Sequence, residues 1–202
     1  LFWSLGLLWK AKKENFLKNV EWIDELDLKA SYGTQGNSSI PPYSTAAYAG
    51  KVGQKKGDMS LGFVSLGNPD LGWEHQSKFT VGVKTRLFNR LDVNIEYYNR
   101  VTSDMLFEVP QPYSSGLPVG SAGYPTRYEN AGRYLNHGID FQMNVDLLRG
   151  RDWGISANMN FNYNRDKVLE LFEGRQTWQE PGGQLAYIVG KPVTFVVPLY
   201  KG

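Results

Sequence analysis

Strict alternation of apolar and polar residues is the feature that most constrains how this chain can fold. Between Gly154 and Arg165 the odd-numbered positions, from Ile155 to Tyr163, are apolar, and the even-numbered positions are serine or asparagine. A period of two places successive side chains on opposite faces of a β-strand, whereas a helix would scatter both sets around its circumference. The segment is therefore predicted to be a strand with one apolar face and one amide-rich face.

The same alternation recurs along the chain and predicts an all-β, antiparallel protein. Six strands are expected on this basis, over residues 3–9, 26–33, 79–87, 93–98, 137–148 and 154–165. A seventh is expected near 187–200, where Pro192 and Pro198 would confine it to a sheet edge or make it a loop.

The connections between these strands are unequal in length. The joins near 88–91 and 149–152 are short, and the 11–24 segment is intermediate, with a short helical turn expected over 12–18. Residues 36–73 and 103–135 form long connections rich in Gly, Pro, Ser and Tyr, and a third begins near Asp166. Short turns on one rim and long loops on the other are typical of outer-membrane barrels.

Three features favour a membrane barrel over a soluble sheet. The segments 137–148 and 154–165 exceed the roughly 5–6 residues of an ordinary strand, and a tilted spanning strand needs roughly 9–11. Aromatic residues stand near strand ends, where interfacial belts use Trp and Tyr, and the polar faces are amide-rich. Two alternatives stay open: a soluble β-sandwich that binds carbohydrate, and a structural or adhesive barrel that transports nothing.

Composition narrows the function classes further. The 202 residues include 22 glycines and no cysteine, so disulfides, cysteine metal sites and thiol catalysis are excluded. The formal net charge is +2, with Lys and Arg scattered along the chain, and no long basic block indicates binding to nucleic acid or to a membrane surface. The apolar run 1–9 is too short for a spanning helix, which needs about 20 residues. Because residue 1 is not Met, we expect the chain to be an excerpt from a longer protein.

Several short sequence motifs, taken in their order along the chain, resemble those of one known family. They are Phe2–Gly6, Glu14–Leu17, Leu26–Asn37, Asn68–Glu74 (NPDLGWE), Ile95–Leu106, Asn130–Gly132, Asn136–Asp140, Gly190–Pro192 and Tyr200–Gly202. This ordered set, which covers nearly the whole chain, resembles the SusC/RagA family of TonB-dependent outer-membrane transporters of the Bacteroidetes.

The resemblance implies an architecture and a set of partners. It implies a barrel of about 22 transmembrane strands in the Gram-negative outer membrane, of which residues 1–202 are a late part, without the plug domain, the TonB box and the final strands. It also implies import of glycans or peptides, energised by TonB, beneath a SusD-like lipoprotein lid. Outer-membrane lipid would surround the barrel.

The sequence predicts no enzyme, cofactor or metal site. His75 and His137 are too isolated for metal spacing, and no nucleophile or phosphate-binding motif is present. Asp140 and Asp146 are expected on the lumen face, either hydrated or paired with Lys84 or Arg86.

Aromatic residues of the long connections are the best ligand-binding candidates, because sugar rings stack on aromatic faces and peptides use them as anchors. They are Tyr43, Tyr48, Tyr113, Tyr124, Tyr128 and Trp178. The alternative for each is that it packs a loop onto its neighbours. Trp3, Trp9 and Trp153 are expected instead in the lipid-facing girdle.

Overall fold

A computed structural model describes residues 2–40, 44–55, 58–65, 67–117, 119, 125–179 and 186–193. Contacts divide the chain into two compact units. The sheet unit comprises Leu1–Gln35, Ser77–Val101 and Asn136–Arg165, and the connection unit comprises Gly36–Gln76, Thr102–Leu135 and Asp166–Gly202. No helix among the described residues is long and apolar enough to cross a membrane.

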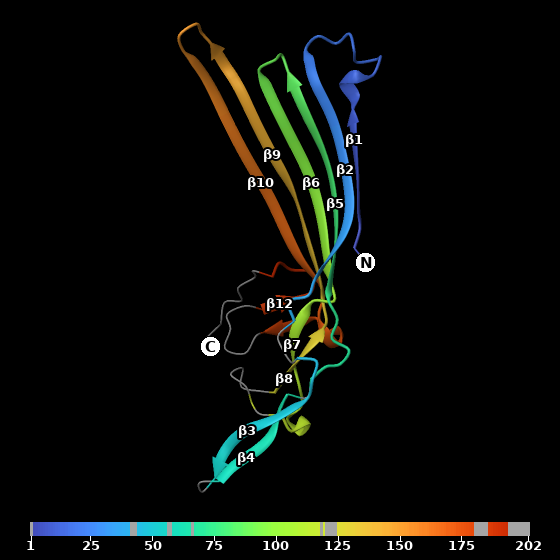
Figure 1. The fold of residues 1–202 in the computed structure, drawn as a ribbon. Coiled ribbons are helices and arrows are strands. Elements are labelled where there is room, and N and C mark those ends of the chain that lie inside the picture. Colours follow the sequence, from blue (N-terminus) through green and yellow to red (C-terminus); the bar gives the residue numbers. More distant parts are fainter. Residues whose placement is uncertain are drawn as a thin grey trace. The chain divides into compact units, whose positions relative to one another are not determined.

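One six-stranded sheet contains the six strands that alternation predicted, without the seventh expected near 187–200. Its members are β1 (Ser4–Lys10), β2 (Ile23–Asn37), β5 (Glu74–Leu87), β6 (Leu91–Ser103), β9 (Arg133–Arg149) and β10 (Gly154–Glu170). They lie side by side in chain order, so each strand pairs with the one before it in the sheet (Figure 1). The short connections β1–β2, β5–β6 and β9–β10 all stand at one end of this sheet (Figure 1).

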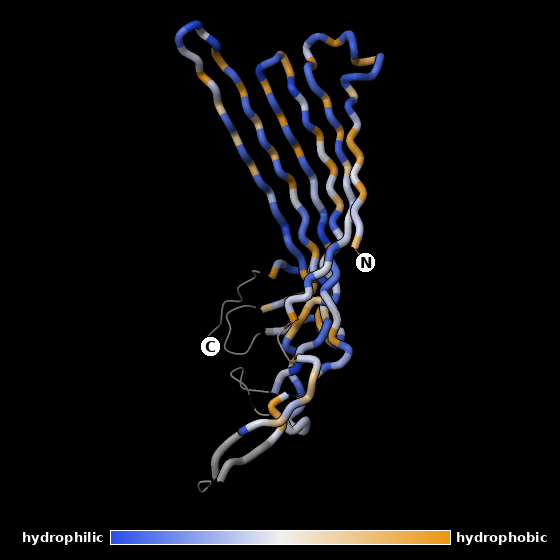
Figure 2. The backbone as a smooth tube through the Cα atoms, in the orientation of Figure 1, coloured by the Kyte–Doolittle hydropathy of each residue, from blue (hydrophilic) through white to orange (hydrophobic). Residues whose placement is uncertain are grey.

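The strand register confirms the two-faced pattern. In the antiparallel β1–β2 pair, Leu7 lies opposite Ala30 and Trp9 opposite Leu28, so apolar residues share one face. The hydropathy colours alternate along the strands in Figure 2. The apolar face stays uncovered within the described chain, since Leu7 is 68% exposed and Phe161 57% exposed. A soluble sandwich would instead bury such residues against a second sheet.

The short connections are held by local hydrogen bonds. After the 3₁₀ helix η1 (Ala11–Lys13), Lys12 Nζ donates to the carbonyls of Leu17 (3.1 Å) and Val20 (2.6 Å), in line with the expected helical turn. In the β5–β6 turn, Phe88 and Asn89 have φ of 55° and 51°. The Phe88 amide donates to the Trp22 carbonyl (2.9 Å), which fixes this turn to the β1–β2 connection.

The long connections contain further strands, most of which the sequence did not predict. They form three two-stranded pairs: β3 (Tyr48–Lys55) with β4 (Asp58–Ser65), β7 (Leu106–Pro110) with β8 (Thr126–Asn130), and β11 (Thr177–Gln179) with β12 (Ala186–Ile188). The 3₁₀ helices η2 (Tyr113–Ser115) and η3 (Phe172–Gly174) accompany them. Of the expected strand at 187–200, β12 covers only the start, and residues 194–200 lie outside the described part.

Most buried apolar side chains belong to the connection unit. They are Leu71, Val109, Leu117, Val168, Leu171, Phe172 and Ala186. In the sheet unit only Ala11 and Ile23, among the described apolar residues, are buried. The sheet unit is therefore a wall with two open faces, and the connection unit holds the small core.

Candidate lumen wall and connection site

An ion pair bridges three strands on the polar face of the sheet. Lys29 of β2 pairs with Glu96 of β6, although β5 lies between these strands. Gly82 of β5 makes this possible, because a Cβ there would lie 2.7 Å from Lys29 Cε and 2.8 Å from Glu96 Cγ. The glycine thus leaves room for the two side chains to meet above the middle strand.

Two further ion pairs extend the charged part of this face. Lys84 Nζ lies 3.2 Å from Glu25, and Arg86 binds both carboxylate oxygens of Asp92 at 2.8 and 2.9 Å. Of the two alternatives expected for Asp140 and Asp146, hydration or pairing with Lys84 or Arg86, the pairing is therefore wrong. The register brings nearer partners to both cations, while Asp146 pairs with Arg149 and Asp140 accepts a hydrogen bond from Asn162.

Amides are the most numerous side chains on the polar face of β9 and β10, alongside Asp140 and Asp146. Asn162 donates to Asp140, Asn158 donates to Asn144, and Asn136 donates to Asn164 at 2.9 Å. An open hollow of about 380 Å³ lies over the charged and amide residues of β2, β5, β6 and β9. This wall offers hydrogen-bond donors and acceptors to a polar solute, as a hydrated lumen does.

In the connection unit, asparagine side chains tie segments that are distant in sequence. Asn130 Oδ1 accepts from the Gly72 amide (2.6 Å), while its Nδ2 donates to the carbonyls of Gly72 (2.8 Å) and Asp104 (2.9 Å). Asn68 Nδ2 donates to the Tyr128 carbonyl (3.0 Å). We call Asn68, Gly72, Asp104 and Asn130 the amide clamp. The amide clamp gives a structural role to residues of the NPDLGWE and Asn130–Gly132 motifs.

Glu74, the last residue of the NPDLGWE motif, extends the amide clamp. Its Oε1 accepts from the Leu106 amide (3.0 Å) and its Oε2 from Asn37 Nδ2 (2.9 Å). Two long connections, 36–73 and 103–135, are therefore joined by side chains from one short motif.

Four aromatic rings form a cluster in the connection unit. Trp178 lies 5.2 Å from Tyr187, 5.6 Å from Phe172 and 6.2 Å from Phe107, measured between ring centroids. Most of these pairs meet edge to face, an arrangement that stabilises aromatic packing. Sequence reasoning found only Trp178 of this group, because its partners are 71, 6 and 9 residues away in the chain.

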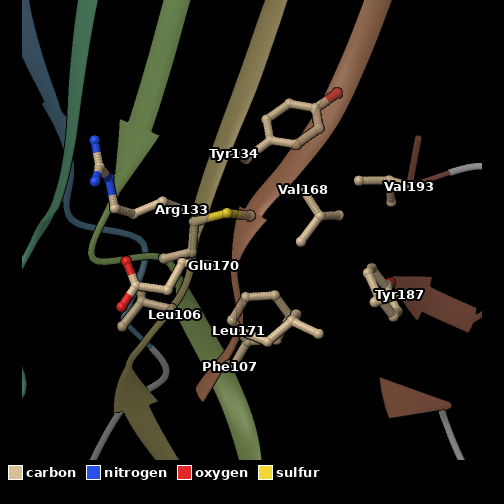
Figure 3. A pocket seen from close by; sticks show the side chains of 10 residues that line it. Leu106, Phe107, Arg133, Tyr134, Val168, Glu170, Leu171, Tyr187 and Val193 are labelled. Atoms are coloured by element: carbon tan, nitrogen blue, oxygen red, sulfur yellow. The ribbon is translucent and has the colours of Figure 1, made fainter. Parts of the chain in front are cut away.

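Beside this cluster lies a small apolar pocket of about 230 Å³ (Figure 3). Met105, Phe107, Val168, Leu171, Tyr187 and Val193 are among its lining residues. Arg133 and Glu170 also border it, so the apolar cavity has charged groups at its margin. A cavity of this size admits one ring or one branched aliphatic group, and not a whole oligomer.

The predicted ligand-binding aromatics fall into three groups. Tyr43 and Tyr124 lie outside the described residues. Tyr48, which opens β3, and Tyr113 of η2 are exposed, at 46% and 70%. Trp178 packs in the ring cluster, and Tyr128 of β8 donates a hydrogen bond to Glu108 Oε1 of β7 (2.5 Å). Tyr48 and Tyr113 present the largest accessible ring surfaces of the four described.

The hydrogen bond from Tyr128 changes its acidity. Glu108 accepts the phenol proton, and this bond, with burial and the carboxylate charge, raises the pKa of Tyr128 to about 12. Loss of the proton would place two anions in contact across the β7–β8 pair. The phenol therefore remains a neutral donor that holds the hairpin.

Comparison with known proteins identifies the relatives of this chain. The family model for the β-barrel of TonB-dependent receptor-like proteins matches residues 1–200. TonB-dependent receptor P3 of Formosa agariphila is 34% identical over 86% of the chain. TonB-dependent receptor SusC of Bacteroides thetaiotaomicron is 27% identical over 92% of it.

Solved structures agree with this similarity. A structure of the RagAB peptide transporter superposes on 96% of the chain with a TM-score of 0.83 and 35% sequence identity. The RagAB importer in its open-open state gives a TM-score of 0.82. The chain spans 17% and 19% of the two curated relatives and 21% of the first RagAB chain.

Proposed function

The chain belongs to the family of TonB-dependent receptor-like β-barrels, and on this premise we propose that it forms part of the wall of an outer-membrane transporter. The whole protein would import its solute with energy supplied through TonB. Its relatives are named as receptors and transporters, which fits a role in uptake and not in catalysis.

The observation that carries the proposal is the sheet with two unlike, open faces. Its apolar face, which includes Leu7 and Phe161, is exposed within the described chain, as a lipid-facing surface is. Its other face carries the ion pairs and amide ladders of a hydrated lumen. By the usual sidedness of such barrels, the short connections would face the periplasm and the long connections the exterior.

Residues 1–202 are proposed to be one portion of the barrel domain, with the plug domain and the final strands elsewhere in the whole protein. A SusD-like lipoprotein would close over the long connections, and TonB would act through the plug. The similarity to SusC and to the RagAB peptide transporter supports this set of partners.

The proposed substrate is a glycan oligosaccharide or a peptide. The polar wall suits either, since both present many hydrogen-bonding groups along a chain. Tyr48 and Tyr113 are proposed to contact it, because their exposed rings could stack on a sugar or anchor a side chain. Tyr43, Tyr124, Tyr128 and Trp178 complete the proposed set, the last two through the packing they provide.

Fractionation and uptake test this function. The full-length protein should separate with the outer membrane, and growth on its substrate as sole nutrient should stop when TonB is deleted. A comparison of glycan and peptide pools would identify the substrate class. Uptake at the normal rate without TonB, or recovery of the protein in the soluble fraction, would contradict the proposal.

A further inference from the structure

Each short connection of the sheet unit presents an exposed aromatic residue near an exposed cation. The β1–β2 connection carries Phe16 and Trp22 with Lys13 and Lys18. The β5–β6 turn carries Phe88 with Arg90, and the β9–β10 turn carries Trp153 with Arg151. We call these eight residues the cationic rim. Because all three connections stand at one end of the sheet, the rim follows one edge (Figure 1).

Among the described residues, no neighbouring carboxylate forms an ion pair with the rim cations. Within the described ranges, Lys13, Lys18, Arg90 and Arg151 form no ion pair, whereas Arg86 and Arg149 on the adjoining strands each have one. Two acidic groups of the rim region accept hydrogen bonds from neutral donors and keep their negative charge. Glu14 accepts from the Trp9 indole (3.1 Å), and Asp24 accepts from the Asn89 amide (2.5 Å).

The three connections hold five cations against three carboxylates, with one further carboxylate, Asp24, at the start of β2. The cations are Lys12, Lys13, Lys18, Arg90 and Arg151, and the carboxylates are Glu14, Glu21 and Asp152. The edge thus keeps an excess of positive charge that can attract anions from outside the chain.

Phe88 gives independent evidence that the rim faces a partner. Its φ of 55° lies in the left-handed region, which a two-residue hairpin turn ordinarily fills with Asn or Gly. The ring stacks on Trp22 at 6.0 Å, yet Phe88 remains 64% exposed. A bulky residue in a strained backbone that stays exposed points to a use beyond local packing.

The rim is also continuous with the apolar face of the sheet. Trp9, which lies on that face, is tied to the β1–β2 connection by its hydrogen bond to Glu14. Aromatic residues with cations beside them, at the border of an apolar surface, match the chemistry of a membrane interface.

We propose that the cationic rim binds the headgroups of anionic phospholipids in the leaflet beside the short connections. The phosphate would accept hydrogen bonds from Lys and Arg, and the aromatic rings would lie at the boundary between headgroup and acyl chain. This inference rests on the proposed function, because it requires the sheet to stand in a membrane.

The experiment uses full-length protein in mild detergent and measures binding of phosphatidylglycerol against phosphatidylcholine. The wild type should retain phosphatidylglycerol preferentially. Lys18→Gln with Arg90→Gln should weaken that binding by about thirtyfold, given the attraction that each of the two surface cations contributes. The matched control, Lys78→Gln with Arg133→Gln, removes two cations outside the rim and should leave it unchanged.

A second variant separates lipid binding from folding. Phe88→Gly relieves the strained φ, so the hairpin should be at least as stable, while phosphatidylglycerol retention should fall. Retention unchanged in both rim variants, or no preference between the two lipids, would overturn the inference. A rim variant that keeps lipid but loses TonB-dependent uptake would do the same, since the rim would then contact a protein.

Failure of the proposed function gives a different result. In that case the wild-type protein would stay monodisperse without detergent, before any lipid is added. Protein that needs detergent, yet binds both lipids equally, would contradict only the lipid inference.

Discussion

Gly82 lies beneath the side chains of Lys29 and Glu96, and a methyl group at this position has no room. Its Cβ would also lie 2.9 Å from the Ile95 carbonyl oxygen, which is backbone and cannot rotate away. Gly82→Ala should therefore separate the ion pair and destabilise the barrel by about 1–3 kcal/mol, the range for an overpacked site. Thermal loss of the folded band of the full-length protein on semi-native gels measures this.

Gly6→Ala is the matched control, because a Cβ at Gly6 meets nothing within 4 Å. That variant should melt with the wild type. Equal melting of the Gly82→Ala protein would show that β5 shifts to accept the methyl group and that the ion pair does not depend on the glycine.

Tyr128 should titrate well above the ordinary value for a tyrosine. Its pKa is raised to about 12 because Glu108 accepts its proton, so the folded protein holds this proton more tightly than the unfolded chain does. The stabilisation is complete below pH 10 and is lost as the pH rises from 10 through 12. The tyrosinate absorbance of the wild type minus that of Tyr128→Phe should therefore rise near pH 12.

Replacing the acceptor checks the cause of this shift. In Glu108→Gln the carboxylate charge is absent, and the same difference titration should move toward pH 10. A midpoint near 10 in the unmodified protein would contradict the hydrogen bond.

At the scale of the elements, the amide clamp organises the connection unit. Asn130 alone makes three hydrogen bonds to backbone groups of two other segments. Asn130→Ala should lose about 2–3 kcal/mol of local stability, at roughly 1 kcal/mol for each bond. Hydrogen exchange should accelerate at residues 68–73 and 104–106, while the amides of β5 and β6 stay protected.

Asn15→Ala, in the short β1–β2 connection, provides the comparison, since Asn15 is exposed there. It should leave exchange in the connection unit unchanged. Uniform acceleration over the whole sheet in Asn130→Ala would mean that the clamp supports global folding and not these segments alone.

Sequence reasoning succeeded where a regular environment imposes a regular pattern. The six long strands were predicted because two unlike faces demand alternation over many residues, as from Ile155 to Tyr163. The pairs in the long connections were missed because β7, β8, β11 and β12 are short and because glycine and proline interrupt the alternation in others. β3 contains two glycines, and β7 ends in a proline.

The candidate site was less predictable, because its geometry depends on distant partners. The motifs containing Asn68 and Asn130 could be recognised in the sequence, but the hydrogen bonds of these two residues join positions about 60 residues apart. Tyr128 and Trp178 could be singled out as aromatic residues of the connections. Their contacts with Glu108 and with the ring cluster depend on strand pairing that no local pattern reveals.

For the whole molecule, the main feature is that successive residues of all six sheet strands face two different environments. The apolar face is exposed over β1, β5 and β10, and the polar face is crossed by ion pairs and amides. Two open faces of this kind are stable together only where one side meets lipid and the other meets water. The lipid-facing assignment can therefore be tested with two adjacent residues.

Phe161 and Asn162 are neighbours on β10 that point to opposite faces. Phe161→Arg places a cation on the apolar face and should destabilise the inserted barrel by about 2–4 kcal/mol near the membrane midplane. Asn162→Arg places the same side chain beside Asp140, which Asn162 already contacts, and should change stability by about 0.5 kcal/mol or less. Folded protein in isolated outer membranes, compared between the two variants, gives the readout. Equal abundance would contradict a lipid-facing position for Phe161, and loss of only the Asn162→Arg protein would mean that the two faces are assigned the wrong way round.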